Sequence, residues 1–292
     1  MRELLKKLLP LSLQDRLRQI LTLLQALSPK LARNSIGKVD HHWRTRINTV
    51  ISSPDNALIK RVEDAGKLSS FHLTMHNGVK VCAHGYYGKG MLNMLVENKG
   101  VHEPQEERIF GEIIDLLPED SRMLELGAYW AFYSLSLLQR HPRARCYLVE
   151  PDPANLMIGR INFRLNRRRG TFVRAMAGAA PQTKPPTISV DTFCENRQIT
   201  HLEILHADIQ GQELAMLHGA DRMLSGKQID CLFISTHSDR LHGDCIQLLK
   251  SKGYDIVAEA DLKGTYSLDG LIVAKRPSLE FSLNPGLSLH AP

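Results

Sequence analysis

One stretch constrains the fold of this chain more than any other: Arg122-Met-Leu-Glu-Leu-Gly-Ala-Tyr-Trp-Ala-Phe-Tyr-Ser-Leu135. A short apolar run ends at Glu125 and Gly127, and apolar residues with helical spacing begin at Ala131. This order predicts a β-strand, a tight turn and a helix N-terminus, the unit that binds nucleotide-like ligands in open α/β sheets. The next strand-like run ends in Glu150, 23 residues after Gly127, close to the ~20 expected of an acid that binds ribose hydroxyls.

The turn lacks the glycines of a dinucleotide-binding site. Gly127 is followed by Ala128, Tyr129 and Trp130, so no second or third glycine lets a pyrophosphate approach the backbone. A ligand with a ribose and an adenine but no phosphate, such as S-adenosylmethionine, tolerates this bulkier turn. On this stretch alone, a methyltransferase and a purely structural strand–turn–helix unit are equally good interpretations.

In the rest of the chain, segments with the spacing of β-strands alternate with segments with the spacing of helices. Predicted strands lie at 146–150, 171–175, 201–208, 230–236, 254–260 and 270–274, and predicted helices at 103–117, 153–165, 212–224 and 240–251. The last two strands are joined without room for a crossover helix, so this pair is antiparallel. We predict an α/β fold with a doubly wound, mostly parallel sheet, Rossmann-like as in class I methyltransferases, with a terminal antiparallel hairpin and an N-terminal helical extension.

This reading divides the chain into four parts. A basic helical extension covers 1–70, a small β-hairpin and loop segment 71–101, the main methyltransferase-like domain 102–276 and a C-terminal tail 277–292. The hairpin is predicted from the turn at Asn77-Gly78, and a loop from Gly85, Gly88 and Gly90.

The N-terminal extension carries the charge of the protein. Residues 1–46 hold ten Lys/Arg and three Asp/Glu, a balance of +7, whereas the whole chain has a formal charge of +6. The main domain is therefore nearly neutral, and we expect no nucleic-acid partner.

Two helices are predicted at 1–9 and 13–27, separated by Pro10. In the second, one apolar stripe recurs at three- and four-residue spacing, formed by Leu13, Leu17, Ile20, Leu21, Leu24 and Leu27. This stripe packs on the main domain or on a second subunit, or it lies on a membrane surface; the absence of Trp and Phe favours packing.

Cysteine usage and hydropathy favour a reducing compartment. Five cysteines are scattered without a Cys-x-x-Cys pair. No apolar run reaches the ~18–20 residues of a membrane span, and the N-terminus has no signal-peptide pattern. We expect a cytoplasmic protein, with a membrane-peripheral location as the alternative.

Five motifs, in this order along the chain, resemble those of the FkbM-type methyltransferases. They are Glu125-Leu-Gly-Ala, Val149-Glu150-Pro151, Ser189-Val-Asp-Thr-Phe193, Ala207-Asp208-Ile-Gln-Gly211-x-Glu213 and Leu217-x-Gly-Ala220. The resemblance spans roughly 102 to 275, and the Asp-x-x-Gly-x-Glu element is its most specific part. Two positions depart from the pattern: Trp130 replaces a small residue, and His206 interrupts the apolar run before Asp208.

The resemblance implies an S-adenosylmethionine-dependent enzyme that methylates hydroxyl groups, often on sugars. It implies that Glu125 and Gly127 line the methionine part of the cofactor, that Glu150 accepts both ribose hydroxyls and that Met176 lies at the adenine. The full cofactor-binding set is Glu125, Gly127, Ala128, Tyr129, Glu150, Pro151, Met176 and Asp208. Two alternatives stay open: Glu150 caps the helix that begins at Pro153, and Met176 is plain core.

Methyl transfer to a hydroxyl requires that its proton be removed. Asp208 and His237 end two neighbouring predicted strands, at the edge where open sheets place their ligands. With an ordinary pKa near 6.5, His237 is predicted to act as a neutral general base together with Asp208. Alternatively Asp208, His237 and His242 hold a divalent metal, Mg or Mn, that orients the acceptor. His237 as a strand-end residue bonded to a backbone carbonyl is the structural alternative.

Three functions remain from the sequence. The leading one is O-methylation of a sugar, glycan precursor or glycosylated metabolite. The second is methylation of a small non-sugar metabolite. The third is a non-catalytic binding or scaffold protein in which Trp130 fills the cofactor pocket.

Overall fold

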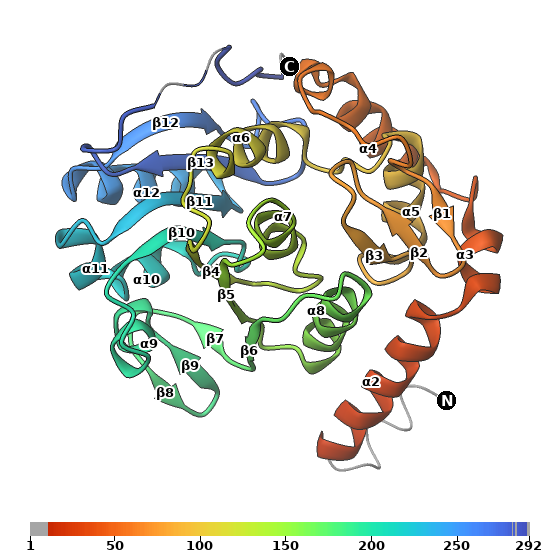
Figure 1. Cartoon of the computed structure of the whole chain (residues 1–292), viewed down its shortest axis with the longest axis horizontal. Helices are drawn as coiled ribbons and strands as arrows, with labels where there is room; N and C mark the ends of the chain where they lie inside the picture. The colour runs from red at the N-terminus through yellow and green to blue at the C-terminus, as the bar shows by residue number, and fades with distance from the viewer. Residues whose placement is uncertain (1–10, 282, 284, 291–292) are drawn as a thin grey trace.

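The computed structural model describes residues 11–281, 283 and 285–290. A seven-stranded sheet forms the centre, in the order β12-β13-β11-β10-β4-β5-β6 (Figure 1). The strands are β4 (Arg122–Leu126), β5 (Arg145–Val149), β6 (Thr171–Val173), β10 (Leu202–Ala207), β11 (Ile229–Thr236), β12 (Asp255–Ala260) and β13 (Gly270–Lys275). β4, β5, β6, β10 and β11 run parallel, whereas β13 is antiparallel to both β11 and β12. The predicted fold class is confirmed, including the terminal antiparallel pair.

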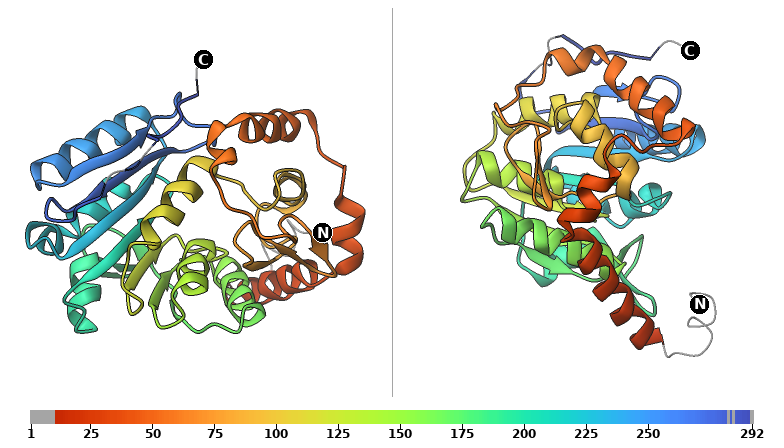
Figure 2. Two further views of the ribbon diagram at one scale, coloured as in Figure 1. Left: turned by 45° about the horizontal axis from the view of Figure 1, so that its top comes forward. Right: turned by 90° about the vertical axis from the view of Figure 1, so that its right-hand side faces the viewer.

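Helices cover both faces of this sheet and enclose two hydrophobic clusters (Figures 1 and 2). Alternate residues of one strand serve different clusters: Met123 joins the first and Leu124 the second. The first cluster includes α6 (Pro104–Ile114), α7 (Phe132–Arg140) and α8 (Pro153–Leu165), and the second α9 (Val190–Asn196), α10 (Glu213–His218), α11 (Asp221–Ser225) and α12 (Asp239–Ser251).

Between β4 and β10 the direction of winding reverses. From β4 the chain proceeds outward through β5 and β6, and it then returns to place β10 on the other side of β4. Crevices at the carboxyl ends of strands beside such a switch point are where open α/β sheets bind ligands.

Two small sheets flank the central one. The first contains β1 (Leu68–Ser69), β2 (His72–Thr74) and β3 (Lys80–Cys82), and the second β7 (Met176–Ala177), β8 (Gln182–Thr183) and β9 (Pro186–Ile188). The predicted hairpin is confirmed as β2 and β3, which pair antiparallel with Thr74 opposite Lys80.

The predicted glycine loop is wrong, because helix α5 (Gly88–Glu97) begins within it. Gly90 lies inside this helix, and a Cβ at Gly90 would meet the Trp43 ring at 2.1 Å. Trp43 belongs to α4 (His41–Ser52). The glycine therefore allows α4 and α5 to approach closely, a role that local sequence does not reveal.

The single helix predicted at 212–224 is also wrong, because it is divided into α10 and α11. The carboxylate of Asp191, from α9, accepts hydrogen bonds from the backbone N–H groups of Arg222 (2.7 Å) and Met223 (3.0 Å). These bonds satisfy the first free N–H groups of α11, so a second helix starts after Gly219.

The N-terminal extension is helical, with α2 (Leu11–Ala26), α3 (Pro29–Ser35), α4 and the 3-10 helix η1 (Pro54–Ala57). Helix α2 lies along α8 and reaches past it at one edge of the molecule (Figure 2). The helix predicted at 1–9 falls outside the described residues. The predicted apolar stripe of α2 is present, but its side chains are exposed, and a different face of α2 contacts the main domain.

Candidate functional site

A cavity of about 580 Å³ opens at the carboxyl edge of the parallel strands, beside the switch point. All eight residues predicted to bind the cofactor line it: Glu125, Gly127, Ala128, Tyr129, Glu150, Pro151, Met176 and Asp208. They come from four separate segments of the chain. The structure therefore brings together the set that sequence analysis predicts; its role in binding stays a prediction.

The turn after β4 forms the floor of this cavity. Gly127 has a φ of +75°, and its backbone N–H donates to the Val149 carbonyl at 2.9 Å. A Cβ at Gly127 would lie 1.7 Å from the backbone oxygen of Asp208. Only glycine fits here, because β4 and the segment after β10 approach so closely.

Glu125 and Glu150 bring two buried carboxyl groups to the cavity. Glu125 accepts a hydrogen bond from the backbone N–H of Ser134 at 3.1 Å, at the start of α7. Burial raises the pKa of both carboxyl groups above their ordinary values. Two desolvated acids on one cavity wall are suited to accept hydrogen bonds from a polar ligand.

Glu150 is not the capping residue of α8. Asp152 has that role, since its side chain accepts from the backbone N–H groups of Ala154 (2.8 Å) and Asn155 (3.1 Å). Glu150 instead accepts from the N–H groups of Asp152 (2.8 Å) and Tyr129 (3.3 Å), which fix its carboxylate at the cavity wall.

Trp130 does not fill the pocket. Its ring is buried and stacks on Tyr86, with centroids 4.3 Å apart and planes 4° from parallel. Asn162, on α8, donates to the Trp130 carbonyl at 2.9 Å and holds the turn in place. The premise of the scaffold interpretation is therefore wrong, because the cavity persists beside this tryptophan.

Met176 lies at the cavity in β7 and is 37% exposed, so it is not core. Its contact with adenine stays a prediction.

His237 and Asp208 are in contact, as their positions at adjacent strand ends predict. Nε2 of His237 lies 3.2 Å from Asp208 and 3.4 Å from Asp269, and Nδ1 lies 3.1 Å from Glu213. The amide nitrogen of Gln210 lies 2.8 Å from Nε2 and donates to the Asp208 carboxylate at 3.0 Å.

The charge of the His237 imidazole differs from the expected one. Burial disfavours the imidazolium, but hydrogen bonds to Asp208 and Glu213 and the charges of Asp269 and Asp208 outweigh it and raise the pKa of His237 to about 10. His237 is therefore a cation at neutral pH, and its expected neutral form is wrong for the free protein. Burial, followed by the charges of Asp208 and Glu103, raises the pKa of Asp269 to about 7.

His242 lies elsewhere. Its Nδ1 is 2.7 Å from the Thr236 hydroxyl and its Nε2 is 3.6 Å from Glu259. Within the described residues, no recorded contact joins His242 to Asp208 or His237, so the predicted metal set is only partly assembled. The tight His/acid cluster that the described chain does contain, His201, Glu203 and Asp230, lies at the opposite, amino end of the strands, where Arg276 also pairs with Asp230.

Sequence analysis missed the contribution of α6 to this site. His102 and Glu103, just before the helix, line the cavity with Tyr133, whose hydroxyl donates to Glu103 at 2.8 Å. His206 also lines it and lies 2.8 Å from Glu106. The sequence signal is His102 followed by three acids within five residues, a pattern that by itself indicates only the start of a helix.

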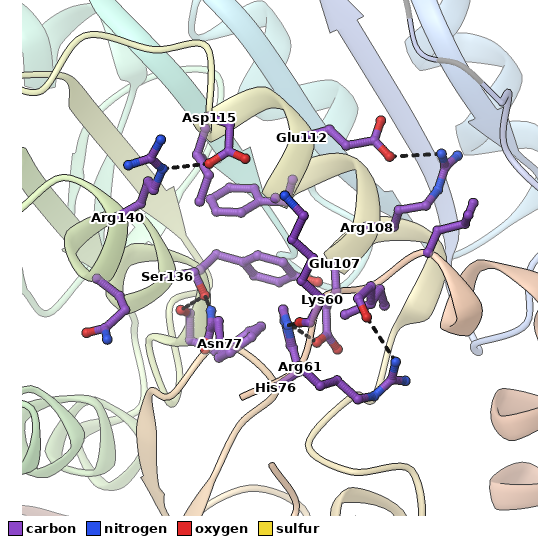
Figure 3. A pocket seen from close by; sticks show the side chains of 18 of the residues that line it. Lys60, Arg61, His76, Asn77, Glu107, Arg108, Glu112, Asp115, Ser136 and Arg140 are labelled. Carbon is purple, nitrogen blue, oxygen red and sulfur yellow. Dashed lines mark hydrogen bonds and ion pairs between the residues drawn. The ribbon is translucent and has the colours of Figure 1, made fainter. Parts of the chain in front are cut away.

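A second cavity, of about 370 Å³, lies between α6, α7 and residues 58–62 (Figure 3). Its lining includes His76, Glu107 and Asn77, whose amide donates to the Ser136 hydroxyl at 2.9 Å. None of the residues predicted from the sequence to form the site lines this cavity, and its aromatic floor belongs to the main core.

Comparison with known proteins agrees with these features. Residues 178–256 match the model of the methyltransferase FkbM domain. This segment contains Asp208, Gly211 and His237, whereas Glu125 and Glu150 precede it. No curated protein matches the sequence.

Several solved structures are similar at low identity. The methyltransferase FkbM from Methylobacillus flagellatus KT has 17% identity and a TM-score of 0.46, with 82% of this chain and 63% of that chain covered. The precorrin-6y C5,15-methyltransferase from Geobacter metallireducens GS-15 has 15% identity and a TM-score of 0.41, with 57% and 86% covered. TrmK from M. capricolum, in complex with S-adenosylhomocysteine, has 13% identity and a TM-score of 0.41, with 61% and 71% covered.

The family match covers the segment in which the most specific motif lies, and the cavity stands where the fold places its ligands. Over residues 178–256 the chain is therefore similar to methyltransferase FkbM domains.

Proposed function

We propose that this protein is an S-adenosylmethionine-dependent O-methyltransferase whose acceptor is a hydroxyl of a sugar, a glycan precursor or a glycosylated metabolite. One observation carries the proposal: the cavity at the switch point is lined by buried acids at the end of β4 and after β5, and by Asp208 after β10, which contacts His237 behind the lining. β5 and β11 are three strand positions apart, roughly 14 Å. That separation suits a cofactor on one side and an acceptor on the other.

On the cofactor side, the roles follow from what each residue offers. The Glu150 carboxylate is held by two backbone N–H groups and keeps acceptor capacity for a pair of ribose hydroxyls. Gly127 leaves the backbone open beside it, and Met176 supplies an apolar surface for adenine. When bound, the cofactor supplies a methyl group on a sulfonium centre, which a hydroxyl oxygen attacks.

On the acceptor side, a carboxylate can accept the proton of the hydroxyl. With His237 cationic, the base is a carboxylate of the same group, Asp208 or Asp269, and His237 holds the two acids in position. A pKa of about 7 makes Asp269 suitable as a base near neutral pH. A divalent ion, Mg or Mn, bound by Asp208 and His237 is the alternative way to orient the acceptor.

Polar groups adjoining the cavity favour an acceptor with several hydroxyls. A small recess next to it is lined by Glu103, Ser235, Ser267 and Asp269. Glu103 and Ser235 also line the main cavity, so the recess lies directly beside it. Carboxylates and hydroxyls recognise vicinal hydroxyl groups by accepting their hydrogen bonds.

Calorimetric titration with S-adenosylhomocysteine tests the cofactor, with a chelator and then with added magnesium. We expect micromolar binding that Glu150→Ala weakens by ~1–3 kcal/mol, the scale of hydrogen bonds to a charged group. Glu195→Ala, which removes an exposed acid of α9, serves as the control. No binding by the folded protein would reject the proposal, and unchanged affinity in Glu150→Ala would remove Glu150 from the site. Screening of glycan and non-sugar acceptors with labelled cofactor then separates the substrate classes.

A further inference from the structure

Helix α2 attaches to the main domain through a mainly polar face. Arg18 pairs with Asp152 at 2.6 Å, and Asp15 pairs with Arg174 at 2.8 Å. Ala26, at the end of the helix, is buried. These contacts fix which side of α2 points away from the protein.

The side that points away is apolar. Six residues at helical spacing are between 37% and 63% exposed: Leu13, Leu17, Ile20, Leu21, Leu24 and Leu27. Two more exposed apolar side chains, Leu31 at 37% and Ile36 at 39%, follow in the sequence within and just after α3. We refer to these eight side chains as the outer face. Contiguous exposed apolar side chains of this kind mark an interaction surface.

Cations border the outer face. Arg16, Lys30, Arg33 and Lys38 are exposed, and within the described residues no ion pair is recorded for any of them. The ten residues before α2 add Arg2, Lys6 and Lys7 in the sequence. The described cations therefore make this part of the surface positive, while the sequence after residue 46 is nearly neutral.

We propose that the outer face binds an anionic membrane surface, with α2 lying in the plane of the interface. A helix with leucines on one side and cations beside them combines the apolar and electrostatic contributions that hold interfacial helices at anionic lipids. Among the described residues, no helix is long and apolar enough to cross a membrane.

A second copy of the chain fits this surface less well. The leucines keep coiled-coil spacing for only about two heptads before Pro29, whereas a stable coiled coil takes ~3–4. A specific dimer interface involves roughly 20–30 residues on each side, and the outer face has eight. The uncompensated cations would also face each other across a symmetric contact.

The position of α2 joins this surface to the cavity. Arg18 lines the cavity and pairs with Asp152 at the start of α8. The bound membrane would therefore lie beside the cavity, along the edge at which α2 projects (Figure 2).

Sedimentation of the full chain with lipid vesicles tests this inference. We expect binding to vesicles of phosphatidylcholine and phosphatidylglycerol that weakens with salt, and little binding to phosphatidylcholine alone. Leu24→Asp should weaken partitioning about tenfold or more. Leu116→Asp is the matched control, since Leu116 is also 63% exposed but lies just after α6. Lys30→Glu with Arg33→Glu should reduce binding to the anionic vesicles.

Two results would overturn the inference. One is wild-type protein that stays in the supernatant with anionic vesicles. The other is a dimer by light scattering that Leu24→Asp dissociates while Leu116→Asp does not, because a second copy would then cover the outer face. Circular dichroism of each variant confirms that it is folded.

Discussion

Replacing Gly127 with alanine tests whether the turn after β4 is built around the absence of a side chain. The new Cβ would lie 1.7 Å from the Asp208 oxygen, whereas real Cβ atoms essentially never approach within 3.0 Å. The turn and the segment after β10 must therefore separate by more than 1 Å. A forced backbone shift in a packed interior costs ~1–3 kcal/mol. The left-handed backbone of a non-glycine residue adds ~1–2 kcal/mol.

Gly37 separates these two contributions. Its φ is +73°, almost that of Gly127, but nothing lies within 4 Å of its Cβ position. Gly37→Ala therefore carries only the backbone cost, offset by the ~0.4–1 kcal/mol that alanine gains through the unfolded chain. We expect Gly127→Ala to be less stable than Gly37→Ala by ~1–3 kcal/mol.

Urea unfolding, with equal slopes in the two variants, measures this difference. Calorimetry with S-adenosylhomocysteine should in addition show weakened binding for Gly127→Ala alone, because the shift moves Asp208 at the cavity wall. Equal stability losses in the two variants would refute the reasoning, since the close approach to Asp208 would then impose no constraint.

Three further predictions concern the acid–imidazole group. His237→Gln should lower turnover by ~10²–10⁴ and leave the S-adenosylhomocysteine affinity unchanged, and full activity would reject a catalytic role. The pH profile of kcat/KM should rise through about pH 7 as the Asp269 carboxylate forms, and it should lose this step in Asp269→Asn; a profile that keeps the step would assign it to another group. The raised pKa of His237 stabilises the fold fully below its unfolded value of 6.5, and this contribution is lost as pH rises to about 10. The urea midpoint of the wild type should therefore fall from pH 7 to 10, and the midpoint of His237→Gln should fall less. The fall that is left in the variant is due to His102, whose pKa is also raised to about 10. Parallel curves for the two proteins would contradict a raised pKa of His237.

Elements with local signals were predicted well. The helix expected at 153–165 is observed as Pro153–Leu165, because Asp152 caps it and proline suits its first turn. Elements shaped by distant residues were not. The break before α11 depends on Asp191, and the close approach of α4 to α5 depends on Trp43 packing against Gly90. Periodicity also predicted the stripe of α2 without revealing which side of the helix faces the protein.

The candidate site likewise contains contacts that the sequence predicts and contacts that it does not. Strand ends in a parallel sheet converge on one edge, so the contact between Asp208 and His237 followed from their places in the sequence. Asp269 sits in the loop between β12 and β13, and its approach to His237 depends on how that loop folds back. Predicting the protonation of His237 also requires knowing how that loop folds back, because an isolated imidazole has no raised pKa.

The acids at the start of α6 explain how the wall of the cavity is fixed before any ligand arrives. Glu106 and Glu107 are buried and Glu103 nearly so, which is costly unless each is paired. His102 contacts Glu103 and Glu107 at 3.1 and 2.6 Å, and His206 contacts Glu106 at 2.8 Å. Both histidines also line the cavity, so pairs that compensate buried charge also orient the groups that a ligand would meet. Removing His206 takes away the imidazole partner of the buried Glu106 carboxylate, whereas Glu107 keeps its contact with His76 when His102 is removed. Loss of His206 would therefore affect the fold and the site together. Asp269 is more exposed than these acids, so its substitution should disturb the fold less than loss of His206.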